Sequence, residues 1–300
     1  MGLTRRKKKI IKGGQPTGPC IIVDLKNNAG LGNQLTIYAA GIVASNKTGL
    51  PMCILPVKGN HHSSKNYRTL FKHGRPVEHK NMNTRISKST RVHQNIAGDP
   101  HGKWSNRNLP TNKTHNISMD GVYYQNYESI KSAFPQIRSE LAEEFKKQYP
   151  DLETEAFKGT STDVTMFMHV RKGDYGPSSL PTDYYKRAIE IVNGESKIKT
   201  LYILSDDVDY CKNEINKKEW KPTAEVRWMD DPKDELKTMY LMSLCKGGAI
   251  MSASTFSCWG VYLGADAVQN SIIIYPKKWI TGDSKRISFP ESIGNKWISI

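Results

Sequence analysis

No run of apolar residues in this 300-residue chain approaches the roughly 18 that cross a bilayer. The basic opening, MGLTRRKKKIIKGG, is followed by no apolar segment, so we expect no secretory leader. Arg6 also stands where the myristoylation pattern requires Ser or Thr. These absences predict a soluble globular protein, and its length leaves room for two domains of ordinary size.

Cysteine pairs at close spacing are absent, and acidic residues are few. The five cysteines (20, 53, 211, 245 and 258) form no C-x-x-C pair, and an odd number argues against a disulfide framework. We therefore expect a reducing compartment, the cytoplasm. Lys and Arg number 44 against 29 Asp and Glu, a net charge of +15. This charge suits an anionic partner, namely nucleic acid, a membrane surface, a polyanion or a phosphorylated small molecule, or simply a lysine-rich soluble protein.

Several functional motifs are also missing. There is no G-x-S-x-G elbow, which argues against an esterase. No RNP, KH, zinc-finger or helix-turn-helix signature is present, so nucleic acid is not the expected partner. No His/Cys cluster or EF-hand spacing indicates a metal, although paired aspartates such as Asp206-Asp207 have the chemistry to hold Mg²⁺. We expect neither a metal nor a cofactor.

The second half of the chain alternates buried strands with helices. This pattern predicts an α/β fold with a doubly wound parallel sheet. The expected strands are 164–170, 200–204, 225–229, 249–253 and 271–275. The expected helices are 183–193 with Asp183 as N-cap, 208–218, 234–245 and 256–265.

The first half begins like a second unit of the same kind. A strand at 21–25 leads through a glycine turn into a helix at 34–46, and Gly30 and Gly32 allow a ligand to approach the backbone. A purely structural glycine turn is the alternative. Further strands are expected at 52–57 and 117–124, and a helix at 129–149 that Pro135 splits. The predicted organisation is a basic arm 1–19, a first α/β domain 20–158, a second Rossmann-like domain 159–280, and a tail 281–300 packing back on the first half.

Polar clusters follow the strands of the second half, and the carboxyl ends of parallel strands share one rim, where ligands bind in open α/β sheets. Arg171 offers a bidentate grip on phosphate, and Lys172 only a point charge. Ser254 and Thr255 begin a helix and offer hydroxyl and backbone N–H groups. His169 is either a catalytic residue or a structural one whose ring forms a hydrogen bond within the fold. The clusters are Arg171 to Asp174, Ser205 to Asp207, Asp230-Asp231 and Ser254 to Ser257, and the aspartates also suit N-caps or, for Asp174, a partner of Arg171.

Taken in order, five motifs resemble the α-1,2-fucosyltransferase family, glycosyltransferase family 11. They are Gly30-Leu-Gly-Asn-Gln34 with Tyr38-Ala-Ala40, His169 to Tyr175, Leu241 to Cys245, Ser254 to Ser257 with Trp259, and Pro276 to Trp279. The resemblance implies two Rossmann-like halves in a GT-B-like fold, with 20–158 as the acceptor-side domain and 159–280 as the nucleotide-sugar-binding domain. It also implies GDP-L-fucose as donor, inversion without a metal, and an acceptor that is often a terminal β-galactoside.

The resemblance also implies residue roles. Arg171 would bind the β-phosphate, His169 would lie near guanine, and the Gly30–Asn33 loop would close from the other domain. Arg171 and Asp174 are therefore the candidate catalytic residues, with Asp174 as one candidate general base and assistance by the departing phosphate as the alternative. The candidate donor-binding residues are Gly30, Gly32, Asn33, Gln34, His169, Lys172, Ser205, Asp206, Asp207, Thr238, Ser254, Thr255 and Phe256.

Three positions depart from the family pattern. Lys172 replaces a second Arg, and Cys258 replaces a Trp. Thr238 stands where the family usually has an Asp thought to read guanine, and a hydroxyl does not match a carboxylate's acceptors. Asp234 or Glu235 would have to substitute, or the donor is another nucleotide sugar.

Two other hypotheses remain beside fucosyl transfer from GDP-fucose to a glycan hydroxyl. One is the same fold using another nucleotide sugar, and the other is a basic protein that binds nucleic acid or another polyanion. A weak membrane-surface contact through residues 5–12 is a further alternative, worth about 1 kcal/mol per basic residue.

Overall fold

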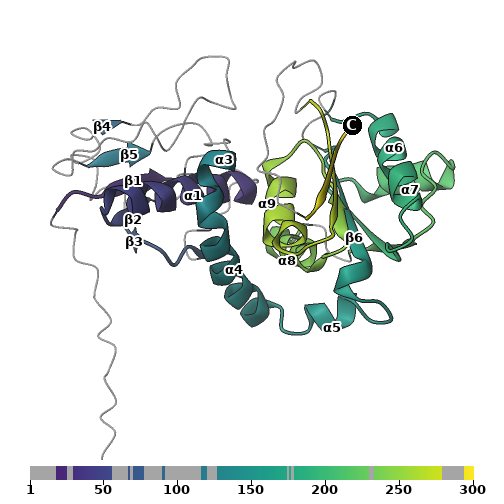
Figure 1. Cartoon of the computed structure of the whole chain (residues 1–300), viewed down its shortest axis with the longest axis horizontal. Coiled ribbons are helices and arrows are strands. Elements are labelled where there is room, and N and C mark those ends of the chain that lie inside the picture. The colour runs from purple at the N-terminus through teal and green to yellow at the C-terminus, as the bar shows by residue number, and fades with distance from the viewer. Residues whose placement is uncertain are drawn as a thin grey trace, which may run out of the picture.

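The computed structural model describes residues 18–25, 30–55, 67, 70–77, 90–91, 116–119, 127–173, 176, 179–229, 233–278 and 294–300. Two β-sheets form two lobes, and helices from both halves of the chain fill the space between them (Figure 1). All strand pairs among the described residues are parallel. The fold is therefore α/β in both lobes, as the sequence predicts.

The first sheet has the strand order β3-β2-β1-β5-β4. Its central strand β1 (Ile21–Asp24) is buried because it carries an apolar side chain at three of its four positions. Helix α1 (Leu31–Thr48) follows it and ends at Gly49, whose φ of 70° is the left-handed conformation that glycine adopts without strain. The other strands are β2 (Met52–Leu55), β3 (Arg75–Pro76), β4 (Thr90–Arg91) and β5 (Ile117–Met119).

The second sheet has the order β8-β7-β6-β9-β10-β11. Counted from β6 this is 3-2-1-4-5-6, the arrangement of dinucleotide-binding folds, in which ligands bind where the strand order reverses. That switch point lies between β6 and β9. The strands are β6 (Thr165–Val170), β7 (Thr200–Ser205), β8 (Glu225–Trp228), β9 (Gly248–Ile250), β10 (Ile272–Tyr275) and β11 (Lys296–Ser299). The helices are α6 (Thr182–Asn193), α7 (Val208–Asn216), α8 (Glu235–Leu244) and α9 (Thr255–Leu263).

The middle of the chain connects the lobes and also packs between them. Pro135 interrupts the predicted long helix, which consists of α3 (Tyr127–Ile130), a 3₁₀ turn (Lys131–Ala133) and α4 (Phe134–Gln148). Short α5 (Leu152–Ala156) and a second 3₁₀ turn lead into β6. Arg138 of α4 donates to the carbonyl oxygen of Tyr262 in α9 at 2.7 Å, and Phe134 stacks on Tyr262. Helix α4 therefore packs on the second lobe, and the predicted boundary at 158/159 stays a prediction.

Two sequence-based predictions about local structure are wrong. Residues 294–300 do not pack on the first half, because β11 pairs in parallel with β10 and completes the second sheet. Asp183 is not the N-cap of α6, since the helix begins at Thr182 after an extended Pro181, and Asp183 pairs with Arg187 at 3.0 Å one turn on. Helix α1 also begins earlier than predicted, at Leu31.

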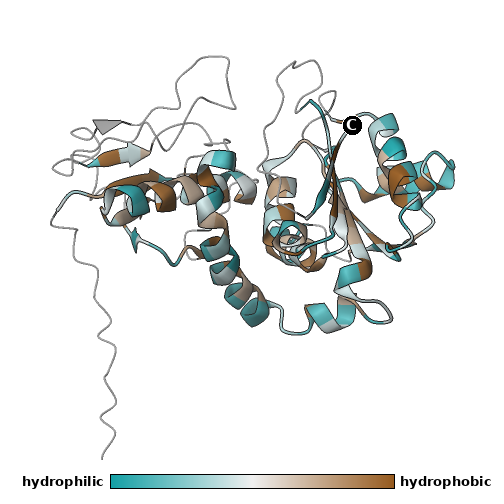
Figure 2. Cartoon of the chain, in the orientation of Figure 1, coloured by the Kyte–Doolittle hydropathy of each residue, from teal (hydrophilic) through white to brown (hydrophobic). Residues whose placement is uncertain are grey.

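One hydrophobic cluster extends through both lobes, from β1 and α1 to α9 and β10. Figure 2 shows this as hydrophobic colour along central strands such as β1 and β6 and on α1, while α5 and much of α4 are hydrophilic. All five cysteines are buried, and none of them forms a disulfide. In the described part of the chain, no helix has both the length and the apolar character needed to cross a membrane.

Candidate functional site

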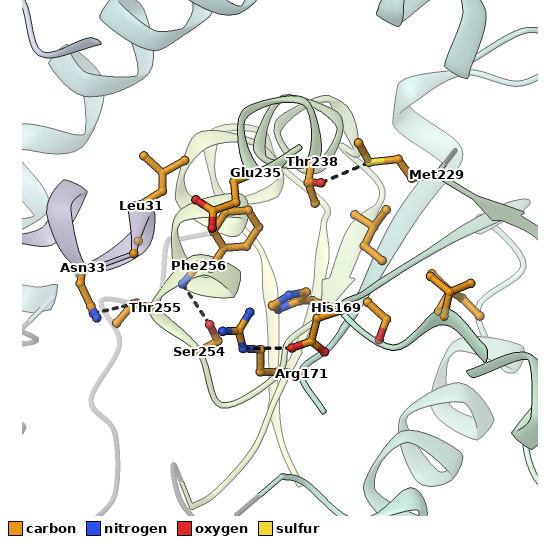
Figure 3. A pocket seen from close by; sticks show the side chains of 17 residues that line it. Leu31, Asn33, His169, Arg171, Met229, Glu235, Thr238, Ser254, Thr255 and Phe256 are labelled. Carbon is orange, nitrogen blue, oxygen red and sulfur yellow. Dashed lines mark hydrogen bonds and ion pairs between the residues drawn. The ribbon is translucent and has the colours of Figure 1, made fainter. Parts of the chain in front are cut away.

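A cavity lies at the switch point of the second sheet and is closed on one side by the first lobe (Figure 3). Its walls come from the beginnings of α1, α7, α8 and α9, from the carboxyl-terminal ends of β6 and β7, and from the residues that directly follow β6, β7 and β8. The lining residues are Gly30, Leu31, Gly32, Asn33, His169, Arg171, Ile203, Leu204, Ser205, Asp206, Val208, Met229, Glu235, Thr238, Ser254, Thr255 and Phe256.

Arg171 brings a permanent positive charge to this cavity. Its Nε lies 3.3 Å from Oδ2 of Asp206, which follows the neighbouring strand β7. The other carboxylate oxygen of Asp206 accepts the backbone N–H of Lys172 at 2.8 Å. Gly173 lies against the same carboxylate, because a Cβ there would come within 3.1 Å of Oδ2. Asp206 therefore holds both the side chain of Arg171 and the backbone after it.

His169 joins the two strands of the switch point. Its Nδ1 lies 2.7 Å from the hydroxyl of Ser252, which follows β9. Burial, and after it the charge of Arg171, lower the pKa of His169 to about 3. The imidazole is therefore neutral at physiological pH and serves as a hydrogen-bonding group. Its ring lies 5.5 Å from that of Phe256, between centroids.

Two helix N-termini meet at the cavity. Ser254 caps α9 by accepting the backbone N–H of Phe256 at 3.3 Å. Thr255 donates across the lobes to the side-chain oxygen of Asn33 in α1 at 2.9 Å. The two backbones touch at Gly32, since a Cβ there would lie 2.5 Å from the backbone nitrogen of Phe256. Glycine at position 32 is therefore what allows the helices to approach.

The first turn of α8 forms another wall. Asp234 is its N-cap and accepts the N–H of Lys237 at 3.0 Å and the phenol of Tyr149 at 2.9 Å. The hydroxyl of Thr238 donates back to the carbonyl oxygen of Asp234 at 2.8 Å. Glu235 faces the cavity, and its Oε2 accepts the phenol of Tyr67 from the first lobe.

Not every predicted site residue lines the cavity. Gln34 is fully buried in the first lobe, where its side chain accepts the N–H of Tyr67 at 3.3 Å. The ammonium of Lys172 lies over the ring of Tyr210, 4.4 Å from its centroid. Asp207 caps α7 by accepting the N–H of Tyr210 at 2.9 Å, as its N-cap alternative predicts. Asp174 and the pair Asp230-Asp231 lie outside the described residues.

The other ten predicted donor-binding residues line the cavity, and the predicted catalytic residue Arg171 lines it with them. They are Gly30, Gly32, Asn33, His169, Ser205, Asp206, Thr238, Ser254, Thr255 and Phe256, and their roles toward a ligand stay predictions. The apolar wall of the cavity was not predicted from the sequence. Leu31 lay inside the glycine motif and Met229 ended a predicted strand, so the positions of both indicated that they could line the site. The residues not identified as lining the site are Leu31, Ile203, Leu204, Val208 and Met229.

One side of the cavity thus presents the guanidinium of Arg171 and the hydrogen-bond donors at the start of α9. Arg171 and the first turn of α9 suit an anion with several oxygens, such as a diphosphate. Within the described residues, no group of three or more His, Cys, Asp or Glu side chains is arranged to hold a metal ion.

Two lobes of parallel α/β structure around a cavity at the switch point define a GT-B-like fold of the kind found in glycosyltransferases. The chain belongs to glycosyl transferase family 11, whose sequence profile matches residues 16–300. It is therefore a glycosyltransferase.

Individual proteins resemble the chain more distantly. The O-antigen biosynthesis glycosyltransferase WbnK of Escherichia coli is 31% identical over 129 residues, which are 40% of this chain and 41% of that protein. The match thus spans about two fifths of that relative's length. The structure of NodZ α-1,6-fucosyltransferase soaked with GDP-fucose has a TM-score of 0.53 and 15% identity, covering 82% of this chain and 93% of its own. NodZ from Bradyrhizobium gives 0.52 and 13%, covering 83% and 94%. These structures show the fold.

Proposed function

We propose that the protein transfers L-fucose from GDP-L-fucose to a glycan hydroxyl, with inversion at the anomeric carbon and without a metal. The α-1,2 linkage on a terminal β-galactoside and a cytoplasmic location are part of the proposal. Membership in family 11 supports it, as does the fold shared with NodZ, which was soaked with GDP-fucose. The observation that carries it is the meeting of Arg171, after β6, with the N-terminus of α9, after β9, in one cavity.

The leaving group is the centre of the proposed chemistry. As the bond between the sugar carbon and the phosphate oxygen breaks, GDP gains negative charge. Arg171 and the N–H groups at the start of α9 are placed in advance to stabilise that charge. Removing one such group commonly lowers kcat by about 100- to 1000-fold. Asp206 keeps the guanidinium oriented, so little reorganisation is needed during the reaction.

The acceptor hydroxyl attacks the anomeric carbon from the face opposite the phosphate. One carbon–oxygen bond forms as the other breaks, and the hydroxyl proton leaves to a base. Asp174 is the candidate base, and the departing phosphate is the alternative. The N-terminus of α1, at Gly30 to Asn33, reaches the same cavity from the first lobe and would contact the donor there.

A second candidate is transfer of another sugar from another nucleotide. One observation favours it: the Thr238 hydroxyl already has two acceptors within the protein, the carbonyl oxygen of Asp234 at 2.8 Å and the sulfur of Met229 at 3.2 Å. This side chain therefore offers the base at most an acceptor. The membrane contact of residues 5–12 concerns residues outside the described part and stays a prediction.

The test is a transfer assay with GDP-fucose and a panel of β-galactosides, with UDP- and dTDP-sugars in parallel. We expect turnover with GDP-fucose alone and a loss of at least about 100-fold in Arg171→Ala. Arg187→Ala is the matched control, because Arg187 lies on the outer surface of α6 and pairs only with Asp183 among the described residues. Turnover with another nucleotide sugar in place of GDP-fucose would favour the second candidate.

A further inference from the structure

Glu235 is the one side chain of the α8 first turn whose carboxylate both faces the cavity and keeps an open oxygen. The polar groups of its neighbours already have hydrogen-bond partners within the protein. Asp234 caps the helix and accepts the phenol of Tyr149, and Thr238 donates to the helix backbone. Glu235 accepts the phenol of Tyr67 on Oε2, and within the described part of the protein Oε1 has no hydrogen-bond partner. Asp206, the other cavity carboxylate among the described residues, is paired with Arg171.

The position of Glu235 limits what it can bind. In Figure 3 it projects from α8 on one side of the cavity, with Arg171 and Ser254 on the opposite side and the ring of Phe256 between. A diphosphate held by Arg171 and the α9 N-terminus therefore lies away from this carboxylate, which would repel it. The carboxylate instead suits a neutral group that presents N–H donors, at the end of the ligand remote from the phosphates.

We propose that Glu235 reads the nucleobase of the donor and selects guanine. This inference rests on the proposed function, because it takes the ligand to be a nucleoside diphosphate sugar. Guanine presents its N1–H and its exocyclic amine side by side, and a carboxylate has acceptor sites on both oxygens to receive them. Uracil flanks its single N–H with carbonyl oxygens, and adenine sets a bare ring nitrogen beside its amine. Either base would leave the carboxylate facing an acceptor.

The geometry of α8 explains why this role falls to position 235. Glu235 precedes Thr238 by three residues, so both project from the same face of the helix into the cavity. Tyr67 fixes the carboxylate from the first lobe, and its phenol still leaves a second lone pair on Oε2 for the base. Tyr67 is thus a positioning residue, which acts on the base through Glu235.

The experiment measures nucleotide binding by calorimetry, without the transfer reaction. GDP is compared with IDP, whose base lacks the exocyclic amine, and with UDP. For the wild type we expect GDP to bind about 10-fold more tightly than IDP and more tightly still than UDP. In Glu235→Gln we expect GDP affinity to fall about 10- to 100-fold and the preference for GDP over IDP to shrink toward unity. Glu190→Gln, the same change on the exposed side of α6, leaves both values unchanged.

The results separate this inference from the proposed function. Wild-type protein that binds UDP or IDP as tightly as GDP overturns the inference without any variant. Glu235→Gln with unchanged GDP affinity and an unchanged preference for GDP over IDP also overturns it, because the carboxylate then does not contact the base. Tyr67→Phe gives a second readout if Glu235→Gln does not fold, and we expect a smaller loss of the GDP preference. Guanine selectivity with no fucosyl transfer would reject the proposed function alone.

Discussion

At the residue scale, the pair Arg171–Asp206 shows how two strands build one functional group. Neither side chain is deeply buried, at 31% and 26% exposed, so the pair serves orientation more than stability. Asp206 also fixes the backbone of Lys172, and these two contacts together determine where the guanidinium points.

Replacing Asp206 with Asn tests that positioning. We expect kcat/KM for the donor to fall about 10-fold, because the amide keeps one acceptor oxygen but loses the charge that holds Arg171. The unfolding midpoint stays close to that of the wild type. Asp183→Asn removes the carboxylate of another Arg–Asp pair and is the control, with unchanged kinetics. Equal kinetic losses in both variants would show that Asp206 has no special role.

His169 makes stability depend on pH. Its pKa is lowered from 6.5 to about 3 in the folded protein, so between these values the unfolded chain binds an extra proton. Stability attributable to this group is therefore lost as pH falls through that window, by at most about 1.4 kcal/mol per pH unit, and does not change above it. The free energy of unfolding, measured with urea at a series of pH values from about 4.5 to about 7, should rise less steeply with pH in His169→Gln than in the wild type. Parallel slopes would contradict the assignment.

At the scale of elements, the site depends on the contact between the N-termini of α1 and α9. The contact is backbone to backbone at Gly32, and two side-chain hydrogen bonds accompany it. Thr255 donates to Asn33, and Trp259 donates its indole N–H to Thr36 at 2.9 Å in a buried position. The first lobe therefore packs against the end of the cavity at which α9 begins.

Gly32→Ala should separate these helices. The added methyl would meet backbone atoms of Thr255 and Phe256 at 2.5 to 2.8 Å, and backbone cannot move aside as a flexible side chain does. We expect donor affinity and kcat/KM to drop about 10- to 100-fold, because a displacement of about 1 Å is costly at a reacting centre. Gly18→Ala is the control, since nothing lies within 4 Å of its added Cβ. Unchanged donor affinity in Gly32→Ala would refute the contact.

The sequence predicts the second lobe's elements well for a physical reason. Strands buried on both faces read as continuous apolar runs, and such runs predicted β6, β7 and β10 closely. Strand β11 was not predicted, because its sequence KWIS mixes polar and apolar residues, as edge strands do. Its pairing with β10 is also a tertiary contact that the residues of β11 alone do not indicate. The site residues on the strand ends followed from topology. The sequence named both Asp234 and Glu235 at the start of α8, but which of them caps the helix and which faces the cavity depended on helix phase. The burial of Gln34 likewise depended on packing that one sequence does not supply.

At the scale of the whole molecule, the lobes share a continuous apolar cluster. α4 belongs to the first half of the chain and packs on α8 and α9, with Phe145 stacked on Tyr240 at 5.1 Å between centroids. Interfaces between independent domains are usually smaller and more polar. The two lobes should therefore behave as one cooperative unit.

Thermal unfolding tests this directly. We expect a single transition in which the calorimetric and van't Hoff enthalpies agree, and a shift of the whole transition to higher temperature with GDP. Trp259 fluorescence, isolated by replacing the other tryptophans with Phe, should follow the same curve as far-ultraviolet circular dichroism. Two separate transitions would show that the lobes fold independently.

The central claim is that the diphosphate of the donor binds where Arg171 and the α9 N-terminus meet. The most direct measurement is a crystal structure of the protein with GDP. The account predicts phosphate oxygens within hydrogen-bond distance of the Arg171 guanidinium and of the backbone N–H of Thr255. Phosphates bound elsewhere, with this cavity unoccupied by nucleotide, would contradict it.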